Sequence, residues 1–97
     1  MSDTLRRARD CVVAGVRDNP AAPVGDPSLI AQLESPDGDC SFEALGFDSM
    51  AAMELCIFIE CETRVALSVA DLEAHPSVNL LARHLSRRMG PRRWFRR

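Results

Sequence analysis

The sequence has neither a long apolar run nor a leader-like beginning. No stretch of about 18 apolar residues occurs among its 97 residues, so nothing predicts a transmembrane helix. The first residues, Met1 to Arg7, lack the apolar segment of a secretory signal peptide. We therefore expect a cytoplasmic protein with no membrane partner. A chain of this length forms one domain around one modest hydrophobic core.

Lysine is also missing, and every one of the 12 basic residues is arginine. Residues 1–86 hold 6 arginines and all 14 acidic residues, for a net charge of −8, whereas residues 87–97 hold 6 arginines and no acid. A basic tail of this kind can bind nucleic acid or an acidic surface. The simpler expectation is a solvated extension that folds back onto its own acidic body. We predict a domain of residues 1–89, a basic tail of residues 90–97, and no nucleic-acid partner.

The cysteines and histidines lack the spacing of a metal site or a redox pair. The four cysteines are Cys11, Cys40, Cys56 and Cys61. We expect reduced thiols, with Cys56 in the core and Cys61 able to be exposed. No convincing base lies near a cysteine in the sequence, although pairing with His75 or His84 stays open. These two histidines are nine residues apart and are not expected to converge, so we predict a loop residue, a helix-surface residue and no metal.

Apolar periodicity predicts a first helical segment from Thr4 to about Asp18. Asn19-Pro20 should end it, because the residue before a proline avoids the helical region. The following connection, residues 19–47, contains four prolines and is longer than compact domains usually use. Within it, residues 29–33 are expected to form one short helical turn capped by Ser28.

Three more helical segments are predicted in the second half of the chain: Ser49 to about Thr63, Val69 to Ala74, and from the cap Ser77 to about Met89. The expected core positions of the first of these are Met53, Cys56, Ile59 and Thr63, with Ala52 and Leu55 adjoining. The apolar stripe of the last is Val78, Leu81, Ala82, Leu85 and Met89. Amphipathic helices of these lengths pack as a small all-α bundle.

The most informative stretch runs from Leu45 to Ala52, where a loop ends in Leu-Gly and a serine opens an apolar helix. Asp48 is a good N-cap, because its carboxylate can accept hydrogen bonds from backbone N–H groups of the first turn. Ser49 then occupies the first helical position, where unpaired N–H groups and the helix dipole favour an anion. Gly46 lets the loop turn sharply and leaves room beside the serine. These residues alone are equally typical of an ordinary helix cap.

The sequence Leu-Gly-Phe-Asp-Ser-Met at residues 45–50 resembles the prosthetic-group attachment site of acyl carrier proteins, where Leu-Gly-x-Asp-Ser is followed by Leu or Met. The resemblance extends from Phe42 to Leu85. It implies a small four-helix bundle with three longer helices, one short helix and a long first loop. Residues 63–68 are similar to the family's loop after its second helix, so Val65 and Leu67 should point inward. Thr63 stands where the family usually has an aromatic residue.

The resemblance implies a non-catalytic carrier. Ser49 would bear covalent 4′-phosphopantetheine, transferred from coenzyme A by a phosphopantetheinyl transferase, with Asp48 and Gly46 shaping the cofactor-binding site. The arm of a monomeric carrier would hold an acyl or aminoacyl group as a thioester and present it to loading and chain-processing synthase enzymes. The expected partner-binding residues are Met50, Glu54 and Glu60.

The cargo stays open at this stage. Asp48 and the acidic helix favour an acyl carrier of fatty-acid or polyketide type, whereas the His75–Val78 element and the thinner acidic face are similar to carriers of peptide synthesis. The arginine- and alanine-rich composition suggests a GC-rich bacterium, and a chain from Met1 to a short tail fits a discrete carrier in polyketide or related secondary-metabolite biosynthesis. The alternative is a non-enzymatic helical adaptor whose basic tail binds nucleic acid or an acidic partner. The sequence shows no set of a nucleophile, a base and a residue that orients the base, so nothing in it indicates an enzyme.

Overall fold

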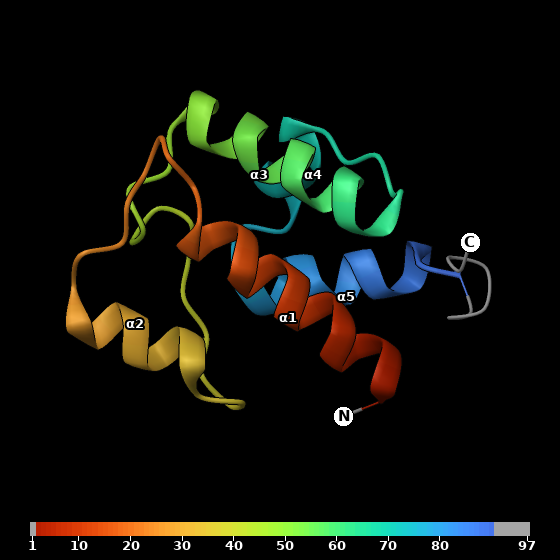
Figure 1. The fold of residues 1–97 in the computed structure, drawn as a ribbon, viewed down its shortest axis with the longest axis horizontal. Helices are drawn as coiled ribbons and strands as arrows, with labels where there is room; N and C mark the ends of the chain where they lie inside the picture. The colour runs from red at the N-terminus through yellow and green to blue at the C-terminus, as the bar shows by residue number, and fades with distance from the viewer. Residues whose placement is uncertain (1, 91–97) are drawn as a thin grey trace.

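The computed structural model describes residues 2–90, in which five helices are connected by loops (Figure 1). They are α1 (Asp3–Arg17), α2 (Pro27–Glu34), α3 (Ser49–Thr63), α4 (Val69–Ala74) and α5 (Val78–Arg88). Within residues 2–90 the only β-type pairing is an isolated bridge between Ser41 and Ser77. No helix in this range is long and apolar enough to cross a membrane. The expected all-α bundle is confirmed. The predicted basic tail, apart from Gly90, lies outside the described residues.

Helices α1, α3 and α5 enclose the core. Figure 1 shows that α1 and α5 lie side by side and run antiparallel, with α3 above them and α4 beside α3. The largest fully buried side chains come from four of the five helices: Leu33, Leu55, Ile59, Leu81, Leu85, Val12, Val16 and Val78. Burying each side chain of this size stabilises the fold by about 1.5–3 kcal/mol relative to exposure. The predicted apolar stripe of α5 is confirmed, since all five of its members are buried.

A glycine lets α1 and α3 approach closely. A Cβ atom added at Gly15 would lie 2.6 Å from Cδ1 of Leu55 and 2.8 Å from Cδ1 of Phe58. Both distances are shorter than a van der Waals contact, so a larger residue would require the Leu55 and Phe58 side chains to shift. Phe58 is half-buried and lies against Gly15.

The predicted helical turn at residues 29–33 is part of a longer helix, α2, which begins at Pro27. The expected cap, Ser28, is wrong: Asp26 is the N-cap, and its side chain accepts a hydrogen bond from the Ser28 N–H at 2.9 Å. Proline suits the first helical position because its fixed φ is already helical and its missing N–H would have no partner there. Leu33 is the one buried residue of α2 and joins this helix to the core.

A buried arginine ties α1 to the connection after it. Arg9 is 7% exposed, and its guanidinium donates to the carbonyl oxygens of Leu33 (3.2 Å), Ser35 (3.0 Å) and Gly38 (2.9 Å). A fourth hydrogen bond, 2.8 Å long, runs from its Nε to the Asn79 side chain on α5. These partners are neutral, so the guanidinium acts by donating several hydrogen bonds at once. Together these hydrogen bonds fix the path of the long connection.

One predicted core position is wrong. Met53 is 55% exposed, whereas Ala52, Leu55, Cys56, Ile59 and Thr63 are buried as expected. The buried residues recur at spacings of three and four along one side of α3, and Met53 falls outside that arc. In the loop after α3, Val65 and Leu67 are buried, as the sequence predicts.

Candidate functional site

The start of α3 is built by a side-chain cap. Asp48 has extended backbone geometry, and its carboxylate accepts a hydrogen bond from the Ala51 N–H at 2.9 Å. Ser49 is the first helical residue and is exposed. The first-turn N–H groups that remain without helical partners carry the positive end of the helix dipole. A hydroxyl placed here is accessible, and an anion attached to it would be stabilised by those groups.

The loop before Ser49 is held in a tight turn. Gly46 has a φ of +78°, in the left-handed region that favours glycine, and nothing lies within 4 Å of a Cβ atom added there. Phe42 and Phe47 close this turn, with a backbone hydrogen bond of 3.0 Å from the Phe47 N–H to the Phe42 carbonyl and ring centroids 5.2 Å apart. The positive φ agrees with the sharp turn that the sequence predicts at Gly46.

Asn19 anchors the start of α3 to the end of α1. Its amide nitrogen donates to the Ala51 carbonyl at 2.8 Å, and its side-chain oxygen accepts from the Ala21 N–H at 2.9 Å. The side chain is 5% exposed. The sequence predicts only that Asn19-Pro20 ends the first helix, because a hydrogen bond across 32 positions leaves no local pattern. Asn19 therefore positions the turn that carries Ser49.

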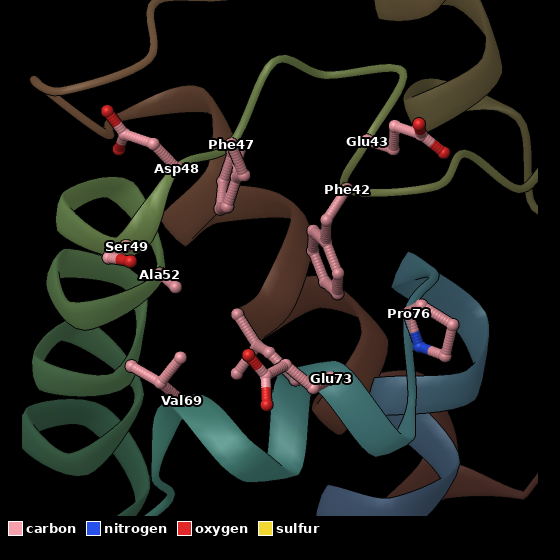
Figure 2. Close-up of a pocket in the computed structure, with 10 residues that line it drawn as sticks. Phe42, Glu43, Phe47, Asp48, Ser49, Ala52, Val69, Glu73 and Pro76 are labelled. Atoms are coloured by element: carbon pink, nitrogen blue, oxygen red, sulfur yellow. The ribbon is translucent and has the colours of Figure 1, made fainter.

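A hollow of about 400 Å³ opens beside Ser49. Its walls come from the loop before α3, from the first turns of α3, from α4 and from the α4–α5 junction (Figure 2). Figure 2 shows the rings of Phe42 and Phe47 extending into the space between α3 and α4. The lining residues are Phe42, Glu43, Phe47, Asp48, Ser49, Ala52, Val69, Leu72, Glu73 and Pro76. No local pattern in the sequence indicates this hollow, because the segments that form its walls meet only in the folded chain.

The outward face of α3 combines apolar and acidic side chains. Met50, Met53 and Ile57 are 65%, 55% and 56% exposed, and they follow one another along the helix after Ser49. Glu54 and Glu60 are exposed beside them. Exposed apolar residues gathered on one helix are typical of a surface that contacts other proteins.

The two histidines converge, contrary to the sequence prediction. The rings of His75 and His84 stack with centroids 4.1 Å apart and planes inclined by 14°. His84 Nε2 lies 3.2 Å from the Asp71 carboxylate, and His75 Nδ1 lies 2.9 Å from the Asp71 carbonyl oxygen. Neither histidine has a local sequence signal for this contact, which forms only where the end of α4 meets α5 in the folded chain. Within residues 2–90 no group of three or more ligating side chains could hold a metal.

Asp71 joins this histidine pair to the cap of α4. Its carboxylate accepts from the Ser68 N–H at 2.8 Å, while the Ser68 hydroxyl accepts from the Asp71 N–H, a reciprocal capping box. The Ser68 N–H bond is the main reason that the pKa of the Asp71 carboxyl lies below its usual value, and the neighbouring His84 lowers it further. One carboxylate thus caps the start of α4 and also lies against His84 of α5.

The cysteines are free thiols, and three of them are poor nucleophiles. Burial, followed by the Glu62 carboxylate, raises the pKa of Cys11 to about 11. Burial is also the main cause that raises the pKa of Cys40 and of Cys56. Because the thiolate is the reactive form, these environments suppress nucleophilic chemistry at neutral pH. As expected, Cys56 is buried and Cys61 is exposed.

The comparisons with known proteins give one match. Residues 29–85, more than half of the chain, match the family model described as "Phosphopantetheine attachment site". The match begins within α2, ends within α5 and includes the loop and helix start around Ser49. No curated protein and no solved structure matches the chain.

Proposed function

We propose that this chain, which belongs to the family of phosphopantetheine-bearing carrier proteins, carries its prosthetic group on the hydroxyl of Ser49. Proteins of this family are non-catalytic carriers that a phosphopantetheinyl transferase modifies on a serine. The observation that carries the assignment to Ser49 is its exposed position at the capped N-terminus of α3.

The other serines in the matched range support this choice by their environments. Ser68 and Ser77 are the N-caps of α4 and α5, and their hydroxyls accept hydrogen bonds from the Asp71 and Leu80 N–H groups. The Ser41 hydroxyl accepts a hydrogen bond from the Ala44 N–H within a turn. Ser35 lies at the C-terminal end of α2, where the helix dipole disfavours an attached anion. Ser49 lies at the opposite kind of helix end, where a phosphodiester is favoured.

The surroundings of Ser49 suit the attached group. The arm joins through a phosphodiester, so its charge would lie near the first-turn N–H groups of α3, while Gly46 leaves space for it on the loop side. Asp48 and Asn19 hold that turn in place through their hydrogen bonds to Ala51. When bound, the arm supplies a terminal thiol that holds the cargo as a thioester. This chain's residues provide the attachment oxygen and orient the arm's first atoms.

The outward face of α3 is the proposed contact surface for the transferase and for the enzymes that load and process the cargo. Met50 would contribute apolar area next to the attachment point, and Glu54 and Glu60 would attract basic patches on those partners. Charge at the edge of a transient interface mainly changes the association rate. We further propose that the carrier is a cytoplasmic monomer, that residues 1–89 form the carrier unit, and that it serves polyketide or related secondary-metabolite biosynthesis. The free thiols suit a reducing compartment.

The deciding experiment is intact-mass measurement after incubation with coenzyme A and a broad-specificity phosphopantetheinyl transferase. The wild-type chain should gain one phosphopantetheine, and peptide mapping should place it on Ser49. Ser49→Ala should gain none, whereas the matched control Ser35→Ala should be modified at the wild-type rate. Modification of a different serine, or none with an active transferase, would refute the assignment.

A further inference from the structure

The charge of the hollow beside Ser49 has one sign. Three of its ten lining residues are acidic, namely Glu43, Asp48 and Glu73, and none is basic. The remaining walls are largely apolar, with Phe42, Phe47, Ala52, Val69, Leu72 and Pro76. A group entering this space therefore meets hydrocarbon on its sides and carboxylates around it.

The carboxylates have different places in the hollow. Asp48 is next to Ser49 and also caps α3, Glu73 is on α4, and Glu43 lies on the loop at the edge away from Ser49 (Figure 2). None of the ion pairs formed within residues 2–90 involves Glu43 or Glu73. Glu73 is exposed and is the acid that the α4 wall contributes. It is therefore the side chain best placed to act on the charge of an entering group.

We propose that this hollow receives the acyl end of the chain's own arm and favours a short acyl group ending in an ammonium over one ending in a carboxylate, with Glu73 as the main determinant. The proposal rests on the attachment at Ser49 and names the class of cargo that the carrier suits: a short aminoacyl group. The apolar walls would cover the methylene groups of such a cargo, and a hollow of about 400 Å³ limits its length.

The tether makes weak selection measurable. A group on a short flexible linker has an effective concentration of about 1 mM or more near its anchor. A contact with a dissociation constant of about 1 mM would then be populated about half of the time. An exposed ion pair changes an equilibrium constant by up to about fivefold. Glu73 attracts an ammonium end and repels a carboxylate end, so the two effects act in opposite directions and their free energies add. Docking of ammonium and carboxylate cargoes should therefore differ by about an order of magnitude.

The test uses the full chain carrying three matched cargoes. A broad-specificity transferase would load Ser49 from butyryl-, β-alanyl- and malonyl-coenzyme A, which deliver a neutral, an ammonium and a carboxylate end on acyl groups of similar size. Docking is measured by the amide chemical-shift changes of Ala52, Val69 and Leu72 relative to the unloaded arm. We expect the largest changes with β-alanyl and the smallest with malonyl, and a difference that shrinks as salt is added.

Two variants separate charge selection from simple apolar burial. Glu73→Gln should reduce docking of β-alanyl about fivefold, increase docking of malonyl, and leave butyryl unchanged. The control Glu62→Gln removes an exposed carboxylate of α3 that does not line the hollow, and should change none of the three. Both substitutions are at exposed positions, so the fold should be retained.

The outcomes separate this inference from the proposed function. Equal shift changes for all three cargoes, stronger docking of malonyl, or an unaltered pattern in Glu73→Gln would each overturn the charge selection while Ser49 remains loaded. If no arm is attached to Ser49 in the first place, the proposed function itself is refuted. A β-alanyl preference that is lost in Glu73→Gln and kept in Glu62→Gln would establish the proposal.

Discussion

Replacing Arg9 by methionine should destabilise the fold without touching the proposed attachment site. Methionine keeps a long unbranched stem but loses all four hydrogen bonds of the guanidinium. Hydrogen bonds to a charged group contribute about 1.5–3 kcal/mol each, and the desolvation of the buried guanidinium offsets several kcal/mol of that gain. The Leu33 contact is buried, so its carbonyl would be left unpaired, whereas the contacts with the other three partners are only part-buried. The expected net loss in the free energy of unfolding is about 3 kcal/mol.

The loss is measurable by urea or thermal unfolding followed by helical circular dichroism. For a domain of this size, it corresponds to a fall in Tm of roughly 12–24 °C. Arg9→Lys should lose about half as much, since an ammonium keeps the charge but cannot reach several acceptors in a fixed fork. The matched control is Arg6→Met on the same helix, whose side chain is 61% exposed and which should change stability by less than about 0.5 kcal/mol. A Tm for Arg9→Met within about 5 °C of wild type would refute this account of the connection.

Three further results are expected. The pKa of Asp71 is lowered in the folded state, so its contribution to stability is complete above its unfolded pKa of about 3.9 and is lost as the pH falls through the folded value. Urea midpoints measured between about pH 2.5 and 6 should therefore fall less steeply with decreasing pH in Asp71→Asn than in the wild type. Equal slopes for the two proteins would contradict this. Glu54→Arg should slow loading by a cognate enzyme at low salt while the circular-dichroism spectrum stays unchanged, and identical kinetics would exclude a role for that acid. Truncation after Gly90 should preserve both the melting temperature and the modification of Ser49, because the apolar stripe of α5 is complete at Met89; a large fall in Tm would place the tail within the core.

Local signals explain what the sequence could predict. The cap at Asp48, the helix start at Ser49 and the turn at Gly46 depend on neighbours within a few positions, and all three are present in the structure. The start of α2 also had a local signal, the Asp26-Pro27 pair, but the prediction began at the apolar residues that follow it. Helix stripes were predictable for the same reason, since periodicity is a property of a single segment.

Features that depend on contacts between segments were not predictable. Arg9 lies on an amphipathic helix where an arginine is ordinarily exposed, and only the path of the following connection buries it. The stacking of His75 on His84 requires α4 to pack against α5. The hollow beside Ser49 likewise needs the loop, α3 and α4 to be in place together. A single sequence contains no periodic or capping pattern that would indicate such contacts between residues far apart in the chain.

The short helix α4 has few buried residues that hold it against the core. Of the six residues of α4, only Leu72 is buried, whereas α5 buries four residues and α1 buries five. Exposing one leucine costs about 1.5–3 kcal/mol, to which the contact between Asp71 and His84 adds a small amount. An outward movement of α4 would also have to break the contact of the partly buried Val69 with the core and the stacking of His75 on His84. The opposite wall cannot follow, because the Phe42 N–H is bonded to the Pro76 carbonyl at 3.0 Å and the Val78 N–H to the Cys40 carbonyl at 2.9 Å. Of the walls of the hollow, α4 therefore has the fewest buried residues holding it in place, and we expect it to be displaced first when a guest fills the space.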